Sequence, residues 1–303
     1  MSVLKSLRES RNLNFSDLAD KIDVSSEDVE RWEKDPGSLT EHGLSGLAYC
    51  FGLSSEDLLA AIDGNSFKLT TSDYYINKCK DFEDGWWGHF GVRLNGQDTS
   101  KWFPITLQEA NRVSRVLSSI TSREEWMIVE TLNNRILVFR PTAVSRLWLL
   151  DEAADEPDDD WQISWDGYSG KPGEFYKGLE EYYWEGVGCE GSGEVSSIVR
   201  KHVEAFTDIH DLDLDQVRAL VVETQIYDID GGGFSYDVGD SRLSRIVDSI
   251  ELELPVLMFE LGNENGDLYV SADSVSLIDI PKRRLESYRR EELKCSGESE
   301  YED

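Results

Sequence analysis

The residues with the clearest spacing for metal chemistry are three aspartates, Asp211, Asp213 and Asp215. Carboxylates at positions one, three and five open an EF-hand calcium loop, which also needs glycine at position six and glutamate at position twelve. Those two positions hold Gln216 and Val222 in this chain. The run therefore predicts the start of a helix or strand with exposed carboxylates rather than a calcium site.

The other candidates for metal or nucleophilic chemistry have no supporting pattern. Neither the cysteines nor the histidines show metal-ligand spacing, and the sequence has no nucleophile elbow and no phosphate-binding loop. The segment Gly231-Gly232-Gly233 predicts a hairpin turn. We therefore expect no catalytic residue, no metal and no cofactor, and a protein that is not an enzyme. The residues considered are Cys50, Cys79, Cys189, Cys295, His42, His89, His202 and His210.

The 303 residues carry a large excess of acidic side chains, 61 Asp and Glu against 30 Lys and Arg, for a formal net charge of −31. Such a surface repels nucleic acid and anionic membranes at long range and favours basic partners. A solvated acidic surface, salt adaptation of the source organism and imitation of DNA are all compatible with this charge. The chain has no signal-like or membrane-length apolar run, so we expect a cytoplasmic protein with reduced thiols and no membrane contact.

The first 60 residues predict about five short helices. Apolar residues recur at helical spacing in short blocks that polar turns separate. Serines precede acidic residues where three of the helices should begin, so we expect N-caps at Ser16, at Ser25 or Ser26, and at Ser54 or Ser55.

This pattern resembles the Cro/XRE-type (lambda-repressor-like) helix-turn-helix family over residues 4–60. The resemblance implies that the third helix lies in the major groove of DNA. It also implies that Trp32 belongs to the core and that Glu33 pairs with Arg8 or Arg11. The matching residues are Leu7-Arg8, Arg11, Leu18-Ala19, Val24-Ser25, Val29, Trp32-Glu33, Pro36, Leu39, Leu47-Ala48, Gly52-Leu53 and Asp57-Leu58-Leu59. The positions that the resemblance assigns to DNA or to a partner are Ser25, Ser26, Glu27, Asp28, Glu30 and Arg31.

The chemistry of the third helix leaves two functions open. Glu27, Asp28 and Glu30 repel phosphate, whereas groove-reading helices usually present donors. Residues 1–60 hold six basic and twelve acidic side chains, a net charge of −6. One function is a transcriptional regulator that binds operator DNA and senses a partner or forms a homodimer through its C-terminal region. The alternative is an acidic protein-interaction module, such as an inhibitor, an antitoxin-like factor or a DNA mimic, which reuses the fold to bind a basic partner.

Two stretches of the remaining chain resemble each other. Residues 112–120 and 242–250 share five identities in nine positions. After each comes an apolar strand pattern, a polar turn and a second strand pattern that ends in Ala-Val-Ser or Ser-Val-Ser, so that Val144 aligns with Val275. These observations predict a duplicated ββαβββ unit. A small barrel and an open sheet both fit the pattern.

The predicted fold class is therefore α+β, with an all-α five-helix domain followed by a duplicated, mainly β region. The predicted domains are a helix-turn-helix domain at 1–64, a first α+β unit at 65–155, an acidic linker with an aromatic-rich insertion at 156–205, a second α+β unit at 206–290 and a disordered tail at 291–303.

The sequence also makes predictions for the acidic stretch, the aromatic-rich stretch and four arginines of the remaining chain. The stretch from Asp151 to Asp160 predicts an exposed acidic linker. The aromatic residues of 161–189 fit either a core or a partner-binding face. The arginines fit either solvated helix faces or interface anchors, and these are Arg112, Arg115, Arg242 and Arg245.

Overall fold

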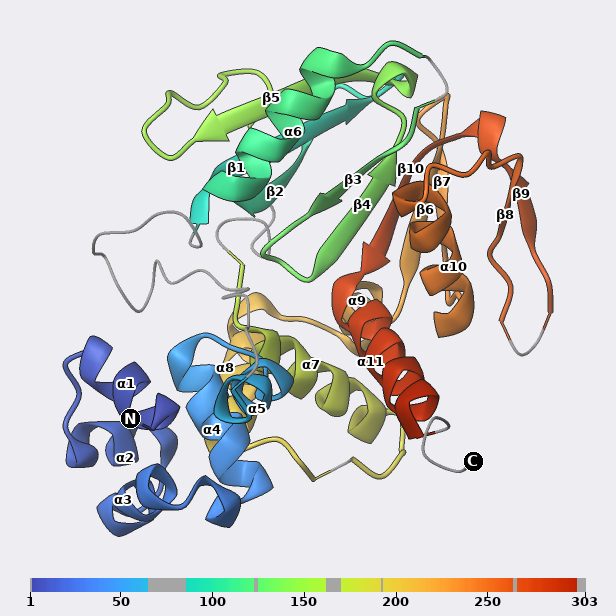
Figure 1. Cartoon of the computed structure of the whole chain (residues 1–303). Helices are drawn as coiled ribbons and strands as arrows, with labels where there is room; N and C mark the ends of the chain where they lie inside the picture. The colour runs from blue at the N-terminus through green and yellow to red at the C-terminus, as the bar shows by residue number, and fades with distance from the viewer. Residues whose placement is uncertain are drawn as a thin grey trace. The chain divides into compact units, whose positions relative to one another are not determined.

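A computed structural model of the chain shows a mixed α+β protein in which N-terminal helices precede a strand-rich region, which confirms the predicted class at that level. Two compact units are present, and Figure 1 shows both. The helical unit comprises residues 1–86 and 171–218, and the strand-rich unit comprises 87–170 and 219–303. The described residues are 2–64, 86–122, 125–161, 170–191, 193–263 and 266–298. Cys79, Trp165, Tyr168 and the last five residues of the predicted tail lie outside them.

Five short α-helices occupy the start of the helical unit. Ser25 and Ser54 cap the third and fifth, each accepting a bond from the backbone N–H three residues on. The predicted cap Ser16 is wrong, because Asn14 and Asp17 form a reciprocal capping box that satisfies two free backbone donors. The helices are α1 (Val3–Ser10), α2 (Phe15–Ile22), α3 (Ser26–Lys34), α4 (Glu41–Phe51) and α5 (Ser55–Ile62).

One apolar core holds these five helices together. Trp32 is 2% exposed, as the sequence predicts, and packs with Leu18, Leu47 and Phe51. A Cβ atom on Gly43 would lie 2.6 Å from the Trp32 ring. Helix α4 can therefore approach the indole this closely only because position 43 is glycine.

Two later helices pack on α4, α7 (Gly173–Gly186) and α8 (Ser197–His210). Glu174 of α7 is fully buried and accepts bonds from the Ser45 hydroxyl at 2.9 Å and the Ser55 N–H at 2.7 Å. The Ser45 hydroxyl in turn accepts from the Ser196 N–H at 3.0 Å. One hydrogen-bond network thus joins α4, α5, α7 and the start of α8.

The segment predicted as an aromatic-rich insertion contributes mainly to packing where it is described. Phe175, Tyr176 and Tyr183 of α7 are buried, and Trp184 is exposed. The core role therefore fits α7 better than a partner-binding face.

The described residues of the strand-rich unit form three antiparallel sheets with the orders β2-β1-β5, β3-β4-β10-β6-β7 and β8-β9. Its last helix runs to Glu298, so the first part of the predicted tail is helical. The elements are β1 (Trp86–Leu94), β2 (Lys101–Thr106), α6 (Leu107–Ser119), β3 (Met127–Glu130), β4 (Arg135–Phe139), β5 (Val144–Asp151), α9 (Leu214–Val221), β6 (Thr224–Asp228), β7 (Gly233–Tyr236), α10 (Asp240–Glu251), β8 (Met258–Glu260), β9 (Tyr269–Ser271), β10 (Val275–Pro281) and α11 (Lys282–Glu298).

The five-stranded sheet separates two apolar cores, because side chains alternate between the faces of each strand. On β4, Ile136 and Val138 pack into one of these cores, which is called core I. Leu137 and Phe139 pack into the other, which is called core II. Core I also takes side chains from α10 and the β8–β9 hairpin, and core II takes them from α6 and the sheet β2-β1-β5. Strand β4 is thus buried on both faces.

A buried ion pair joins β4 to β10. The Arg135 Nε atom lies 2.5 Å from Oδ1 of Asp279, and both side chains are less than a tenth exposed. Arg135 also donates to the main-chain carbonyls of Leu220 and Glu223 near the end of α9, at 3.1 and 3.2 Å. A guanidinium satisfied on several sides can stay charged in the interior, because its donors all find acceptors.

Asp160 departs from the predicted exposed linker. The residues before it from 151 to 159 are mostly exposed, but Asp160 itself is 2% exposed. Its carboxylate accepts bonds from the Ser100 hydroxyl, the Trp148 indole and the Arg93 guanidinium, each at 2.8 Å. Burial alone would raise the pKa of Asp160, but these donors outweigh it and hold the pKa below its usual value.

The four arginines of α6 and α10 serve mainly their own helices and hairpins. Arg112 donates to a main-chain carbonyl of β3. Arg242 and Arg245 bind Glu260 of β8 at 3.0 and 2.6 Å. Arg115 is exposed and donates within its own helix.

Replacing Trp32→Ala in the full chain should lower the free energy of unfolding of the helical unit by about 3–5 kcal/mol, because the indole leaves a cavity in a closed core. Chemical denaturation followed by far-ultraviolet circular dichroism measures the change. Leu59→Ala is the control, because Leu59 is 44% exposed on α5, and it should change stability by less than about 1 kcal/mol. Equal losses in the two variants would contradict the core assignment.

Replacing Arg135→Met should destabilise the strand-rich unit by about 3–5 kcal/mol, because Asp279 then stays buried without its cation. Denaturation followed by near-ultraviolet circular dichroism reports on this unit. Arg115→Met removes an exposed arginine and should change the free energy of unfolding by less than about 0.5 kcal/mol. A similar small effect for Arg135→Met would show that the junction does not depend on the ion pair.

Candidate nucleic-acid interface

Helices α2 and α3 are joined by a tight turn. Helix α2 ends at Ile22, and Asp23 adopts the left-handed conformation with φ of 60°. Ser25 then begins the next helix as its N-cap. The two helices pack against each other and are joined by a three-residue turn.

The inner face of α3 is fixed by packing and by one buried ion pair. Val29 and Trp32 are each 2% exposed. Arg8 of α1 binds Glu33 in a bidentate manner, at 2.6 and 3.2 Å, which agrees with the pairing that the resemblance implied. The bond to Glu33 raises the pKa of Arg8. Helix α3 therefore cannot rotate without breaking this pair.

The six predicted site residues lie on accessible positions of α3 and its cap. Ser25, Glu27, Glu30 and Arg31 are exposed, and the remaining two, Ser26 and Asp28, are half-buried. The structure thus brings the six together on one short helix and its N-cap.

The cations of α3 are paired with its own carboxylates. Arg31 lies 2.5 Å from Asp28 and Lys34 lies 2.6 Å from Glu30. Hydrogen bonding from Ser25 and the charge of Arg31 hold the pKa of Asp28 below its usual value, so this carboxylate is charged at neutral pH. DNA phosphates would have to compete with these carboxylates for each cation.

Two further basic residues of this region, Arg8 and Arg11, form hydrogen bonds that stabilise the packing of the helices. Arg8 is 7% exposed and clamps Glu33. Arg11 donates to the carbonyl of Phe51 at 2.7 Å. Of the six basic residues in 1–60, four therefore remain for phosphate contacts, and these are Lys5, Lys21, Arg31 and Lys34.

Sequence reasoning missed a contact between α8 and the turn. Lys201 and Ser197 of α8 lie 2.9 and 3.3 Å from Oδ2 of Asp23. The hydrogen bond from Lys201 holds the pKa of Asp23 below its usual value. Nothing local marks this pair, because 178 residues separate Lys201 from Asp23.

The described residues offer no other candidate site of comparable definition. None of their Asp, Glu, His and Cys side chains forms a group of three that could hold a metal ion. No helix among them is long and apolar enough to cross a membrane. Comparisons with protein-family models, with curated proteins and with solved structures found no match to this chain.

Replacing Glu33→Gln should lower the free energy of unfolding of the helical unit by about 2 kcal/mol, because it weakens a buried, charge-assisted hydrogen bond. Lys34→Gln, on the same helix, breaks an exposed pair and should cost only about 0.3–0.5 kcal/mol. Thermal unfolding of both variants measures the difference. Equal shifts would show that the clamp of Arg8 on Glu33 does not hold α3 in place.

Proposed function

We propose that this protein is an XRE-type helix-turn-helix transcriptional regulator that contacts DNA through α3. The observation that carries the proposal is the geometry of α2, the Asp23 turn and α3, in which one face of α3 is locked into the core while its predicted site residues stay accessible. A helix held in this way can enter the major groove as a rigid body. The hydroxyl of Ser26 supplies a donor for phosphate or base edges, and Ser25 and Arg31 supply donors once DNA displaces their bonds to Asp28.

The charges of this region imply weak DNA binding by one domain. Four basic side chains remain free of the core, and three of them, Lys5, Arg31 and Lys34, are paired with carboxylates. Because each neutralised phosphate contributes about −0.9 to the slope of log K against log salt, and one of the four cations has no carboxylate partner among the described residues, one domain should show a slope of about −1. Useful affinity then requires several domains bound at once.

A second candidate function is an acidic interaction module that binds a basic protein and not DNA. The self-paired cations of α3 and the exposed carboxylates of Glu27 and Glu30 favour it. In this alternative the same helix face is the contact surface, and its carboxylates attract the partner.

We infer that the strand-rich unit is a duplication, and that it serves assembly or partner sensing. The order β1-β2-α6-β3-β4-β5 recurs as β6-β7-α10-β8-β9-β10. In both stretches a short 3-10 turn precedes the last strand, which begins at Val144 in the first unit and Val275 in the second. The first six elements are called repeat 1 and the second six repeat 2.

Both repeats also carry the same β-bulge. Ser145 of β5 and Ser276 of β10 are skipped where their strands pair with β1 and β6. Each hydroxyl lies 3.0–3.2 Å from two consecutive main-chain carbonyls of the partner strand. A bulge is a specific local feature, so its recurrence at one aligned serine supports the duplication independently of element order.

The test of the DNA-binding proposal is the triple variant Glu27→Gln, Asp28→Asn and Glu30→Gln. It removes three carboxylates and releases two cations, Arg31 and Lys34, from their partners. Non-specific DNA binding should tighten, and the salt slope per domain should change from about −1 to about −3. Fluorescence anisotropy with DNA from upstream of the protein's own gene, titrated with salt, measures both.

The matched control is Asp155→Asn, Glu156→Gln and Asp158→Asn, which makes the same change in net charge on an exposed loop of the other unit. It should shift affinity slightly and leave the slope unchanged. Wild-type protein without measurable DNA binding at low salt would overturn the regulator proposal. Loss of binding of an oligolysine probe in the α3 triple variant alone would then favour the acidic module.

A further inference from the structure

The five-stranded sheet is built from both repeats: repeat 1 contributes β3 and β4, and repeat 2 contributes β10, β6 and β7. Strand β4 of repeat 1 pairs with β10 of repeat 2, which gives the order β3-β4-β10-β6-β7. By the correspondence between the repeats, β3-β4 match β8-β9, and β10-β6-β7 match β5-β1-β2. The two remaining sheets, β8-β9 and β5-β1-β2, are therefore the two parts of a second such sheet. In the described structure these two parts are separate, because β9 and β5 are not paired with each other.

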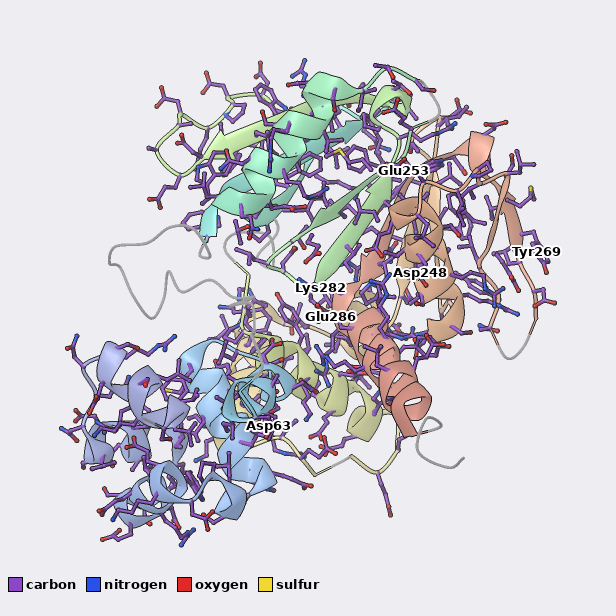
Figure 2. All side chains as sticks on the ribbon, in the orientation of Figure 1. Asp63, Asp248, Glu253, Tyr269, Lys282 and Glu286 are labelled. Carbon is purple, nitrogen blue, oxygen red and sulfur yellow. The ribbon has the colours of Figure 1, made fainter. Side chains whose placement is uncertain are left out.

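The β8–β9 hairpin exposes large apolar side chains, whereas the corresponding side chains of β3-β4 are covered. On β3-β4, Ile128 and Val138 pack into core I. Tyr269, the counterpart of Val138, is 56% exposed and lies opposite Glu260. On the preceding residues of the hairpin, Met258 is 50% exposed and Leu257 is 81% exposed. Figure 2 shows Tyr269 at the outer edge of the strand-rich unit. When several apolar side chains are exposed together on one hairpin, they usually mark a surface that binds a partner.

Repeat 1 shows the complementary gap. Ile278 and Ile280 of β10 are fully buried, because β4 closes the edge beside them. Their counterparts on β5, Leu147 and Leu149, are only half-buried against core II. Among the described strands, β5 is hydrogen-bonded to β1 alone. Repeat 1 thus has an open strand edge and an incompletely covered core at the place where repeat 2 receives β4.

We propose that β9 of one molecule pairs with β5 of a second copy, so that chains join head to tail through a continuous sheet β8-β9-β5-β1-β2. Figure 1 shows β5 and the β8–β9 hairpin at opposite ends of the strand-rich unit, which suits a contact between molecules. Such a contact uses two different surfaces and generates rings or filaments. The inference rests on the duplication proposed above and is independent of DNA binding by α3.

The observed junction supplies the register of the proposed one. Val138 of β4 lies opposite Ile278 of β10. Transferred to the counterparts, Tyr269 of one molecule lies opposite Leu147 of the next. The ladder bonds and the burial of the exposed apolar side chains of β8-β9 provide the attraction.

The buried ion pair is not repeated at the proposed junction. The counterparts of Arg135 and Asp279 are Gly266 and Trp148. Without that pair, the contact between molecules is weaker than the one within a chain, so the assembly depends on concentration.

The first test is the mass of the full chain in solution, measured by light scattering and sedimentation over a range of concentrations. Wild-type protein should exceed the monomer mass and grow with concentration. Met258→Lys with Tyr269→Lys should return it to the monomer, since both side chains are exposed and their replacement spares the fold. Ile209→Lys, at an exposed apolar residue of α8, should leave the mass unchanged. A wild-type chain that stays monomeric at every concentration would overturn the proposal.

The second test is disulfide cross-linking in a chain whose four native cysteines are replaced. An equimolar mixture of the Tyr269→Cys and Leu147→Cys chains should form a cross-linked dimer on oxidation, and Tyr269→Cys mixed with Ser118→Cys should not. A Tyr269→Cys chain that cross-links efficiently to itself would show a symmetric β9 contact and overturn the head-to-tail pairing. DNA affinity of the α3 variants is measured separately, so failure here and failure of the regulator proposal remain distinguishable.

Discussion

The pairing of β4 with β10 is the contact on which the strand-rich unit depends. It places Ile136 and Val138 in one core and Leu137 and Phe139 in the other, so both cores lose a wall if the strands separate. Arg135, the first residue of β4, also joins the two strands by binding Asp279 of β10. Because the paired residues lie about 140 positions apart in the chain, the loop-closure entropy is substantial, and the double-sided burial must offset it.

The pairing of β4 with β10 also shows which strand could pair with the edges of β5 and β9. Among the strands that the structure describes, β10 of repeat 2 pairs with β4, whereas β5 of repeat 1 and β9 of repeat 2 each have one edge without a strand partner. The acidic charge of −31 acts against joining such chains, since like-charged molecules repel. Salt screens this repulsion and also weakens contacts with phosphate, so assembly and DNA binding should respond to ionic strength in opposite directions.

Local patterns in the sequence account for much of the fold, and long-range pairing accounts for the rest. Apolar periodicity indicates the five N-terminal helices, and the repeated Arg-x-Ser-Arg segments indicate α6 and α10. The position of Asp160 was not predictable, because its donors are distant in the chain: Arg93 lies on β1 and Ser100 lies just before β2. Glu174 was missed for a similar reason, since carboxylates are so abundant here that only its burial distinguishes it. At the candidate site the accessible positions of α3 followed from periodicity and the family resemblance, but the pairing of Arg31 with Asp28 and the contact of Lys201 with Asp23 required the structure.

The central functional claim is that α3 is the surface that meets DNA. Carbodiimide labelling of carboxylates on the full chain, with and without DNA from upstream of its own gene, tests it directly, because Glu27 and Glu30 are exposed in the free protein. The account predicts that DNA reduces labelling at these two residues and leaves the exposed carboxylates of Asp158 and Asp159 unchanged. Binding of DNA with unchanged labelling on α3 would contradict it.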